Sequence, residues 1–183
     1  MAREVSIDRA SMLDAVMNII ERDGFSAVSA RTVAGELGVS TQPIYREFGD
    51  MDGLRLAAIG RGFEIFSHYL EGEAIDQAVK YVMFATEHGK LFDFLFRGKH
   101  YTYDGLDGLS HSLIEDTRII DKLQEITGLP REKVFRLHLC VWMALHGLAT
   151  LAADNTAKLD AGEISTLTHE MTRALTMYYK ENG

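Results

Sequence analysis

The sequence predicts an all-α protein of about nine helices. Apolar residues recur at helical spacing along the whole chain, whereas alternating apolar and polar runs bounded by turns, the signal of half-buried strands, are missing. Only two prolines occur, Pro43 and Pro130, so few segments carry a residue that breaks helices. Both observations favour helices packed against helices.

The first fifty residues carry the start and stop signals of three helices. We expect the first over 8–22, after an N-cap at Ser6 and before a stop at Gly24. Ser29 is expected to cap a second helix over 30–37, which Gly38 closes, with Val39 turned inward. Ser40 is expected to cap a third helix over 41–47. The inward face of the first helix is predicted to hold Ala10, Leu13, Val16, Met17 and Ile20.

Asp50 is expected to cap a long fourth helix over 51–70, which contains three glycines. Each glycine costs about 1 kcal/mol relative to alanine inside a helix. We therefore expect this helix to bend or fray near Gly60 and Gly62, with a boundary between two structural units there. Further helices are predicted over 74–87, 90–97, 109–127, 131–153 and 161–180, with a loop over 98–108 and Pro130 in the first turn of its helix.

Composition is ordinary for a globular protein, with 46% hydrophobic and 25% charged residues in 183. No apolar run approaches the roughly 18–20 residues of a membrane helix, and the first ten residues resemble no secretory signal. The single cysteine, Cys140, fits a reducing compartment and is expected to be a core residue. We therefore expect the protein in the cytoplasm.

The net charge of −8 argues against a protein that coats nucleic acid indiscriminately, because non-specific affinity comes mainly from neutralised phosphates. Residues 1–62 hold seven arginines and nine acidic residues, so even this segment is slightly acidic. Any DNA binding must therefore come from a locally shaped surface.

Two short helices joined by Gly38-Val39-Ser40 have the geometry of a helix-turn-helix. Thr41, Gln42 and Pro43 at the start of the second of them would face base edges in the major groove. Free N–H groups at the two helix starts, marked by Ser29 and Ser40, can bind phosphates. Side-chain contacts are expected from Arg31, Tyr45 and Arg46. The turn alone also occurs in helical proteins that do not bind DNA.

The ordered residues around this turn resemble the TetR family of regulators. The resemblance rests on R-A-S-M-L-D-A-V-M from Arg9, on Gly24, and on S-A-R-T-V-A-G-E-L-G-V-S-T-Q-P-I-Y-R-E-F from Ser29 to Phe48. It implies a DNA-binding domain over 1–50 and a helical ligand-binding and dimerisation domain over 51–183. It also implies that Ser29 and Tyr45 grip phosphates and that Phe48 packs in the small core.

One position departs from the family pattern. At the start of the fourth helix the family usually has a lysine that contacts phosphate, whereas this chain has Met51. Asp50 and Asp52 flank that position and would repel a phosphate close to them.

The resemblance is weaker in the second half, where Trp142-Met-Ala-Leu-His146-Gly147 is similar to a W-x-x-x-H-G pattern of one group of TetR regulatory domains. Gly147 inside a strong helical pattern predicts close approach by another helix. In the family the last two helices pair with those of a second copy, which implies a homodimer and a pseudo-palindromic operator. The predicted interface residues are Val141, Leu145, Leu148, Ala152, Ile164, Leu167, Met171 and Leu175.

The middle of the chain is rich in aromatic residues and methionine, which could line a pocket for a small-molecule effector or form ordinary helical core. The residues predicted for such a pocket are Phe66, Met83, Phe84, His88, Phe92, Tyr101, Trp142 and His146. Hydrophobicity alone does not distinguish the two roles.

Two other classes of function compete with a ligand-responsive repressor. A small helical enzyme is disfavoured because none of the seven histidines lies in HExxH or in zinc spacing, and no G-x-S-x-G, phosphate loop or dinucleotide motif occurs. We therefore expect no cofactor and no metal. A DNA-binding protein of the same fold without an effector remains open, and repression is the family default.

Overall fold

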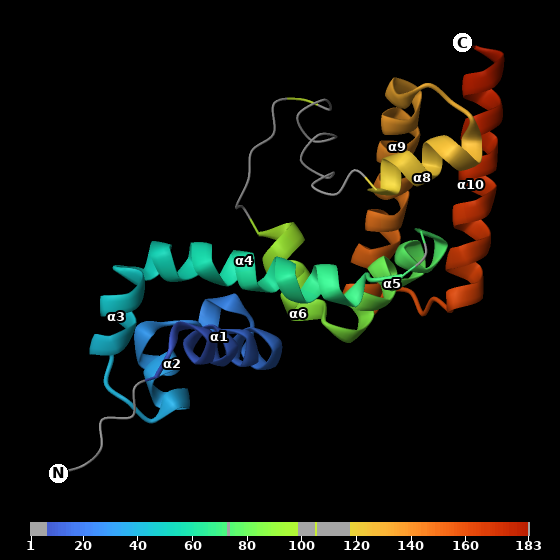
Figure 1. Ribbon diagram of the computed structural model, residues 1–183. Coiled ribbons are helices and arrows are strands. Elements are labelled where there is room, and N and C mark those ends of the chain that lie inside the picture. The colour runs from blue at the N-terminus through green and yellow to red at the C-terminus, as the bar shows by residue number, and fades with distance from the viewer. Residues whose placement is uncertain (1–6, 73, 99–104, 106–117, 183) are drawn as a thin grey trace. The chain divides into compact units, whose positions relative to one another are not determined.

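The computed structural model describes residues 7–72, 74–98, 105 and 118–182. In that part of the chain every regular element is helical, with nine α-helices, one 3-10 turn and one π-helical turn (Figure 1). The predicted all-α class is confirmed.

Two compact units make up the chain, and each is described by itself. The N-terminal unit comprises Met1–Tyr69 and His88–Gly98, and the C-terminal unit comprises Leu70–Glu87 and Lys99–Gly183. The division after Tyr69 comes later than the boundary expected near Gly60 and Gly62. The N-terminal unit contains α1 (Arg9–Asp23), a 3-10 turn (Phe25–Ala27), α2 (Ala30–Leu37), α3 (Gln42–Phe48), α4 (Met51–Tyr69), α6 (Gly89–Phe92) and a π turn (Asp93–Arg97).

Helix α1 begins at an aspartate rather than at the predicted serine. The Asp8 carboxylate accepts a hydrogen bond from the backbone N–H of Ser11 at 2.8 Å, which makes Asp8 the N-cap. Ser6 lies outside the described residues. At the other end the Gly24 N–H donates to the Ile20 carbonyl with φ at +86°, so the predicted stop is confirmed.

The buried face of α1 differs from the prediction at two positions. Ala10 is exposed and Leu13 is only half-buried, because the face is centred closer to Met12. The helix is contacted by α2, α4 and α6, so its apolar arc is wide. The buried residues are Met12, Ala15, Val16, Met17, Ile19 and Ile20.

Helices α2 and α3 form the predicted pair around a tight turn. Ser29 caps α2 through a reciprocal pair of hydrogen bonds with Thr32, and Gly38 closes the helix in the left-handed region at φ +68°. The predicted cap at Ser40 is wrong, since α3 begins at Gln42 and follows Thr41, which has helical φ and ψ and makes no side-chain cap bond. Pro43 in the first turn has no N–H, which leaves one donor fewer to satisfy.

Helix α4 starts at the predicted cap, with Asp50 accepting from the Gly53 N–H at 2.8 Å. It continues as a helix through Gly60 and Gly62 to Tyr69. Gly62 serves a close contact, because a Cβ there would lie 2.8 Å from a methyl group of Leu95. The glycine therefore lets the π turn pack against α4.

The segment 88–98 is part of the N-terminal unit although α5 precedes it in the chain. It was predicted as one helix over 90–97 and is instead α6 followed by the π turn. Phe94 stacks on Phe25 with ring centroids 4.5 Å apart, and His88 Nδ1 lies 2.8 Å from Glu21 Oε1. Lys90 donates to the carbonyl of Arg22. These contacts attach the segment to α1 and to the turn after it.

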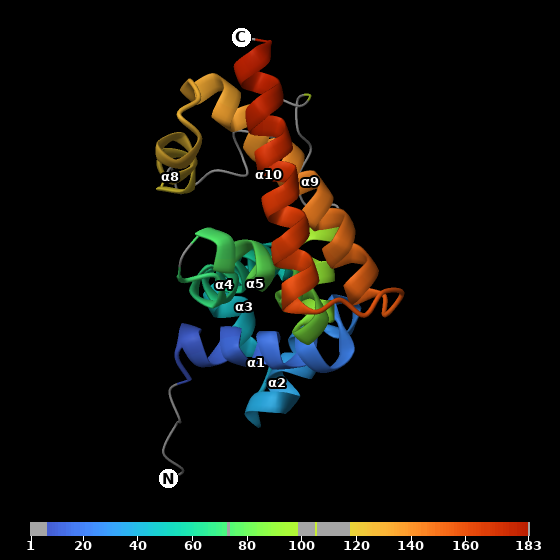
Figure 2. The same ribbon diagram turned by 90° about the vertical axis from the view of Figure 1, so that its right-hand side faces the viewer.

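The C-terminal unit contains α5 (Ala74–Glu87), α8 (Arg118–Thr127), α9 (Arg131–Ala153) and α10 (Ala161–Glu181). The bounds of α5 and α9 agree with the predicted ranges. Helices α9 and α10 run side by side in both views, and α5 packs on both of them (Figure 2). The predicted helix over 109–127 is described only from Arg118 onward, and most of the predicted loop over 98–108 lies outside the described residues.

Helix α9 contradicts the expectation that no segment of the sequence is long and apolar enough for a membrane helix. By length and composition alone it is apolar enough to cross a membrane, with a mean hydropathy of 1.4 over its most apolar window. Thr150 and two histidines interrupt the apolar run, so no unbroken apolar segment of that length stands out in the sequence. In the structure α9 packs against α5, α8 and α10, yet only 28% of that window is buried.

Candidate nucleic-acid interface

Helix α3 presents one exposed polar face and one buried apolar face. Ile44 and Phe48, one helical turn apart, are 1% and 9% exposed and anchor the helix in the core. Gln42, Tyr45 and Arg46 lie on the exposed side, and Tyr45 is 48% exposed. Thr41 and Pro43 are half-buried beside Gln42. The structure therefore places the predicted base-reading residues at the start of α3 and two predicted phosphate contacts, Tyr45 and Arg46, on its exposed side.

The start of α2 is held rigidly by side-chain hydrogen bonds. The hydroxyl of Ser29 lies 3.1 Å from the Thr32 N–H and 3.0 Å from the Thr32 hydroxyl, which itself donates to the carbonyl of Ala27. A rigid helix start keeps its free N–H groups aligned for an anion. Ser40 is exposed in the turn between α2 and α3 and caps neither helix.

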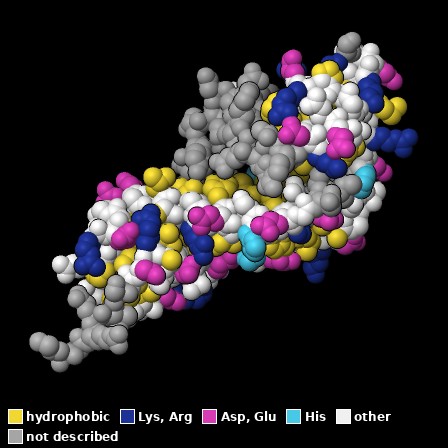
Figure 3. Space-filling model, in the orientation of Figure 1, with side chains coloured by type: hydrophobic (Ala, Val, Ile, Leu, Met, Phe, Trp, Pro, Cys, Tyr) yellow, Lys and Arg dark blue, Asp and Glu magenta, His cyan; other side chains and the backbone are white. Residues whose placement is uncertain are grey.

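The arginines of the N-terminal unit fall into two groups. Most are paired, as in Arg22 with Glu36 and Arg61 with Asp14. Arg31 and Arg46 have no hydrogen-bond or ion-pair partner in the part of the chain that the structure describes, and both are exposed. Figure 3 shows basic and acidic side chains interspersed over the face in view. The two unpaired cations thus belong to α2 and α3.

Sequence reasoning missed one residue near α3. Arg9, at the start of α1, lies with Nη1 3.0 Å from Glu47 Oε1, and its guanidinium carbon is 4.8 Å from the centre of the Phe48 ring. Glu47 and Phe48 are the last two residues of α3. No sequence signal links positions 9 and 47, since only the fold brings them together.

The first turn of α4 carries no cation. Asp50 is used as the N-cap, Met51 is half-buried and Asp52 is exposed. The lysine that the family resemblance leads us to expect at position 51 has no neighbouring substitute within that turn.

The residues predicted for an effector pocket are divided between the two units. Phe66, His88 and Phe92 belong to the N-terminal unit, where Phe66 and Phe92 both contact Phe96 in an aromatic cluster. Met83, Phe84, Trp142 and His146 belong to the C-terminal unit. Tyr101 lies outside the described residues.

A polar cluster in the C-terminal unit involves a tyrosine that the sequence did not indicate. The Tyr81 hydroxyl lies 2.9 Å from His146 Nδ1, and the Trp142 ring stacks on His146 with centroids 4.9 Å apart. Burial raises the pKa of Tyr81, so this hydroxyl stays protonated and can donate to the imidazole. Burial also lowers the pKa of His138, whose Nδ1 has no hydrogen-bond partner within the described part of the chain.

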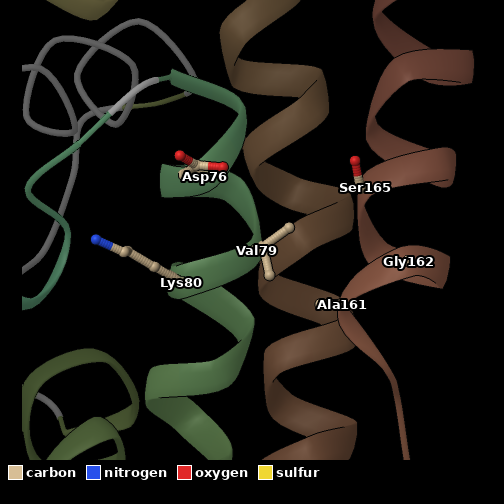
Figure 4. Close-up of a pocket in the computed structure, with 6 residues that line it drawn as sticks. All are labelled: Asp76, Val79, Lys80, Ala161, Gly162 and Ser165. Atoms are coloured by element: carbon tan, nitrogen blue, oxygen red, sulfur yellow. The ribbon is translucent and has the colours of Figure 1, made fainter.

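An open groove of about 410 Å³ lies between α5 and the start of α10 (Figure 4). It is lined by Asp76, Val79, Lys80, Ala161, Gly162 and Ser165. Lys80 points away from α10 in that view and donates to the carbonyl of Glu71. None of the described residues predicted for an effector pocket lines this groove. Among the described residues no group of three histidine, cysteine or acidic side chains could hold a metal ion.

The predicted interface residues differ in exposure. Val141, Leu145, Ala152 and Ile164 are buried within the unit's own core. Leu148, Met171 and Leu175 are half-buried, and Leu167 is exposed. The other large exposed apolar side chains of these two helices are Met143, Leu151, Met177 and Tyr178.

Gly147 is not approached closely by another described part of its own chain. Among the described residues, a Cβ at this position would meet no atom within 4 Å. It lies one helical turn from both Met143 and Leu151, on the exposed side of α9.

Comparisons with known proteins agree with this geometry. The family model described as bacterial regulatory proteins, tetR family, matches residues 12–58, which span most of α1 through the first part of α4. No curated protein matches the chain.

Two solved structures share the fold, both from Rhodococcus sp. RHA1. A TetR-like transcriptional regulator is 18% identical, with 91% of this chain and 96% of that chain covered and a TM-score of 0.61. A protein of unknown function is 25% identical, with 96% and 100% covered and a TM-score of 0.73. Residues 12–58 therefore carry the N-terminal DNA-binding domain of the TetR family, and the chain as a whole shares the fold of a TetR-like transcriptional regulator.

Proposed function

We propose that this regulator binds a pseudo-palindromic operator as a homodimer, with α3 in the major groove, and represses transcription until a small molecule releases it. The observation that carries the DNA-binding part is the exposed face of α3, where Gln42, Tyr45 and Arg46 project from a helix anchored by Ile44 and Phe48. A helix presented in this way can enter the major groove of DNA without breaking its contacts with the protein core.

The residues of this surface divide into base readers and phosphate binders. Thr41, Gln42 and Pro43 stand at the start of α3, where a recognition helix contacts base edges. The amide of Gln42 can bond adenine through one donor and one acceptor. Ser29, Arg31, Ser40, Tyr45 and Arg46 contact the sugar-phosphate backbone in this proposal.

The charge distribution supports this division in an acidic protein. Arg31 and Arg46 are unpaired, whereas other arginines nearby are neutralised by carboxylates. Among the described arginines of the N-terminal unit, the cations available to phosphate are thus few and belong to the two helices of the motif. Few phosphate contacts predict a shallow dependence of affinity on salt.

A homodimer explains the surface of α9. This helix carries no charged residue from Leu137 to Ala153, and a helix that is apolar all round is normally buried. Met143, Gly147 and Leu151 leave an uncovered stripe on it, and Leu167, Met177 and Tyr178 do the same on α10. We propose that a second copy covers both stripes, with Leu148, Met171 and Leu175 at their margin.

An effector site is proposed for the C-terminal unit, where the Tyr81, Trp142 and His146 cluster offers polar atoms within an apolar core. A thermal-shift screen of small molecules addresses this part directly. A compound that raises the melting temperature and weakens DNA binding supports an effector. If the regulator has no effector, any compound that raises its melting temperature in this screen is expected to leave DNA binding unchanged. The cytoplasm is the expected compartment.

The DNA-binding proposal is tested by selecting genomic fragments with the purified protein and then measuring variants on the selected site. Gln42→Ala is expected to relax sequence preference by about 1–3 kcal/mol, whereas Tyr45→Phe weakens binding to all sequences. Equal losses on every sequence for both variants would contradict the proposed division of labour.

A further inference from the structure

The recognition helix proposed above contains one acidic residue, Glu47, at its C-terminal end. Seven residues at about 1.5 Å each make α3 roughly 10 Å long. The Debye length at physiological salt is about 8 Å, so the carboxylate of Glu47 is only partly screened from phosphates that flank the start of α3. The carboxylate also destabilises α3 itself, because the C-terminal end of a helix carries the negative end of the helix dipole and favours cations.

Arg9 compensates this carboxylate from another helix. Its Nη1 lies 3.0 Å from Glu47 Oε1, and its guanidinium carbon lies 4.8 Å from the centre of the Phe48 ring. Phe48 is 9% exposed and fixed in the core, so its ring gives the guanidinium a rigid support. One side chain of α1 therefore contacts both final residues of α3.

Stability alone is a weak explanation for this pair. The two side chains are 52% and 39% exposed, and exposed ion pairs contribute about 0–1 kcal/mol. The other paired arginines of the unit, such as Arg61 with Asp14, make similar contacts away from α3. What distinguishes Arg9 is that its partner belongs to the helix that meets DNA.

We propose that Arg9 is a positioning residue for DNA binding. It cancels the charge of Glu47 and holds the last turn of α3 against α1, so that α3 presents only its cationic and neutral side chains to phosphate. Arg9 itself contacts no DNA. The inference rests on the proposed role of α3 as the recognition helix.

A double-mutant cycle on the full-length protein tests this role, with binding measured to the selected operator fragment and to a scrambled fragment. Arg9→Gln keeps a planar amide near Phe48 and removes the charge. It is expected to weaken binding to both fragments about three- to tenfold. In a Glu47→Gln background the same change is expected to alter affinity less than about twofold, with an unchanged dependence on salt.

The opposite pattern overturns the proposal. An equal loss in both backgrounds, with a log–log salt slope smaller by about one, would mean that Arg9 contacts a phosphate directly. No loss in the Arg9→Gln single variant would also reject it. Arg9→Lys keeps the charge and is expected to bind within about twofold of the parent, so a loss as large as that of Arg9→Gln would show that charge is not what matters.

Two further variants separate failure of this inference from failure of the proposed function. Arg61→Ala removes an exposed pair of the same kind away from α3 and is expected to leave affinity unchanged. Gln42→Ala reports on α3 itself. If Gln42→Ala leaves sequence preference intact, the proposal that α3 is the recognition helix fails. If Gln42→Ala relaxes sequence preference as expected but the double-mutant cycle shows no coupling between Arg9 and Glu47, only the positioning role of Arg9 is rejected. Melting temperatures show whether each variant is folded.

Discussion

A Cβ atom at Gly53 would lie 2.1 Å from the carbonyl oxygen of Phe48. The end of α3 and the first turn of α4 thus touch backbone to backbone, with no room for a side chain. Asp50, between them, caps α4 through the N–H of the same glycine. This contact determines how the chain passes from α3 into α4.

Replacing Gly53 by alanine is therefore expected to destabilise the protein. The added methyl group meets backbone that cannot rotate away, and overpacking of this kind costs about 1–3 kcal/mol. Urea unfolding followed by circular dichroism measures the loss. Gly60→Ala is the matched control in the same helix, because a Cβ there meets nothing within 4 Å. It should stabilise the protein by about 0.5–1 kcal/mol, and equal effects of the two substitutions would contradict the close contact.

The two serines of the helix-turn-helix are expected to differ in their effect on stability. Ser29→Ala removes a side-chain cap and its reciprocal bond with Thr32, at a cost of about 1 kcal/mol. Ser40→Ala removes no cap bond and should stay within about 0.5 kcal/mol of the parent. The difference in urea midpoint between the two variants is the measurement. A similar loss for both would restore a capping role to Ser40.

Met51→Lys is expected to strengthen DNA binding. The first turn of α4 holds no cation, and Asp52 is exposed there. A lysine that reaches phosphate should raise affinity severalfold and increase the log–log salt slope by about 0.9. Met51→Gln, which adds a polar group without charge, serves as the control. Unchanged binding by the lysine variant would indicate that this turn stands away from the DNA.

Leu151→Glu is expected to dissociate the proposed homodimer. It puts a charge at the C-terminal end of the exposed apolar stripe of α9, where burial against a second copy would leave the carboxylate unpaired. Sedimentation velocity over a range of concentrations reports the change. Leu56→Glu is the matched control, since Leu56 is 70% exposed but belongs to the N-terminal unit. Dissociation by both variants, or by neither, would argue against this interface.

His138 is expected to make stability depend on pH. Burial lowers its pKa in the folded state below the usual value of 6.5, so the unfolded chain binds more protons. This contribution to stability is complete above pH 6.5 and is lost as the pH falls from there toward the folded pKa. His138→Leu removes both the titration and the unpartnered Nδ1, and should flatten the unfolding free energy over that range. A parent and a variant that lose stability equally below pH 6.5 would exclude His138 as the source.

Local signals were sufficient for most of the helices. The bounds of α5 and α9 follow from apolar spacing and from stops such as Gly128 and Pro130, which act on neighbouring residues alone. The caps at Ser29 and Asp50 follow for the same reason, since each bond spans three residues. The prediction that Ser40 caps α3 was wrong although serine is a favoured N-cap residue. The helix begins two residues later, at Gln42, after Thr41 with its helical backbone.

The exposed face of α3 was also largely predictable, because Gln42, Tyr45 and Arg46 share a face as soon as their segment is a helix. Which cations remain available there was not predictable. Arg31 and Arg46 stand out only because partners from distant parts of the chain neutralise other arginines, including Arg9. Ion pairs across 14 to 47 residues leave no periodic signal in the sequence.

By itself the sequence determined an all-α chain, the helix-turn-helix and the family of its N-terminal domain, since these depend on the order of neighbouring residues. Only the tertiary structure decided that Arg9 pairs with Glu47, that Tyr81 meets His146, and that Gly147 lies on an uncovered side of α9. The physical reason is that helical periodicity specifies which residues share a face, whereas the packing of several helices decides what each face meets.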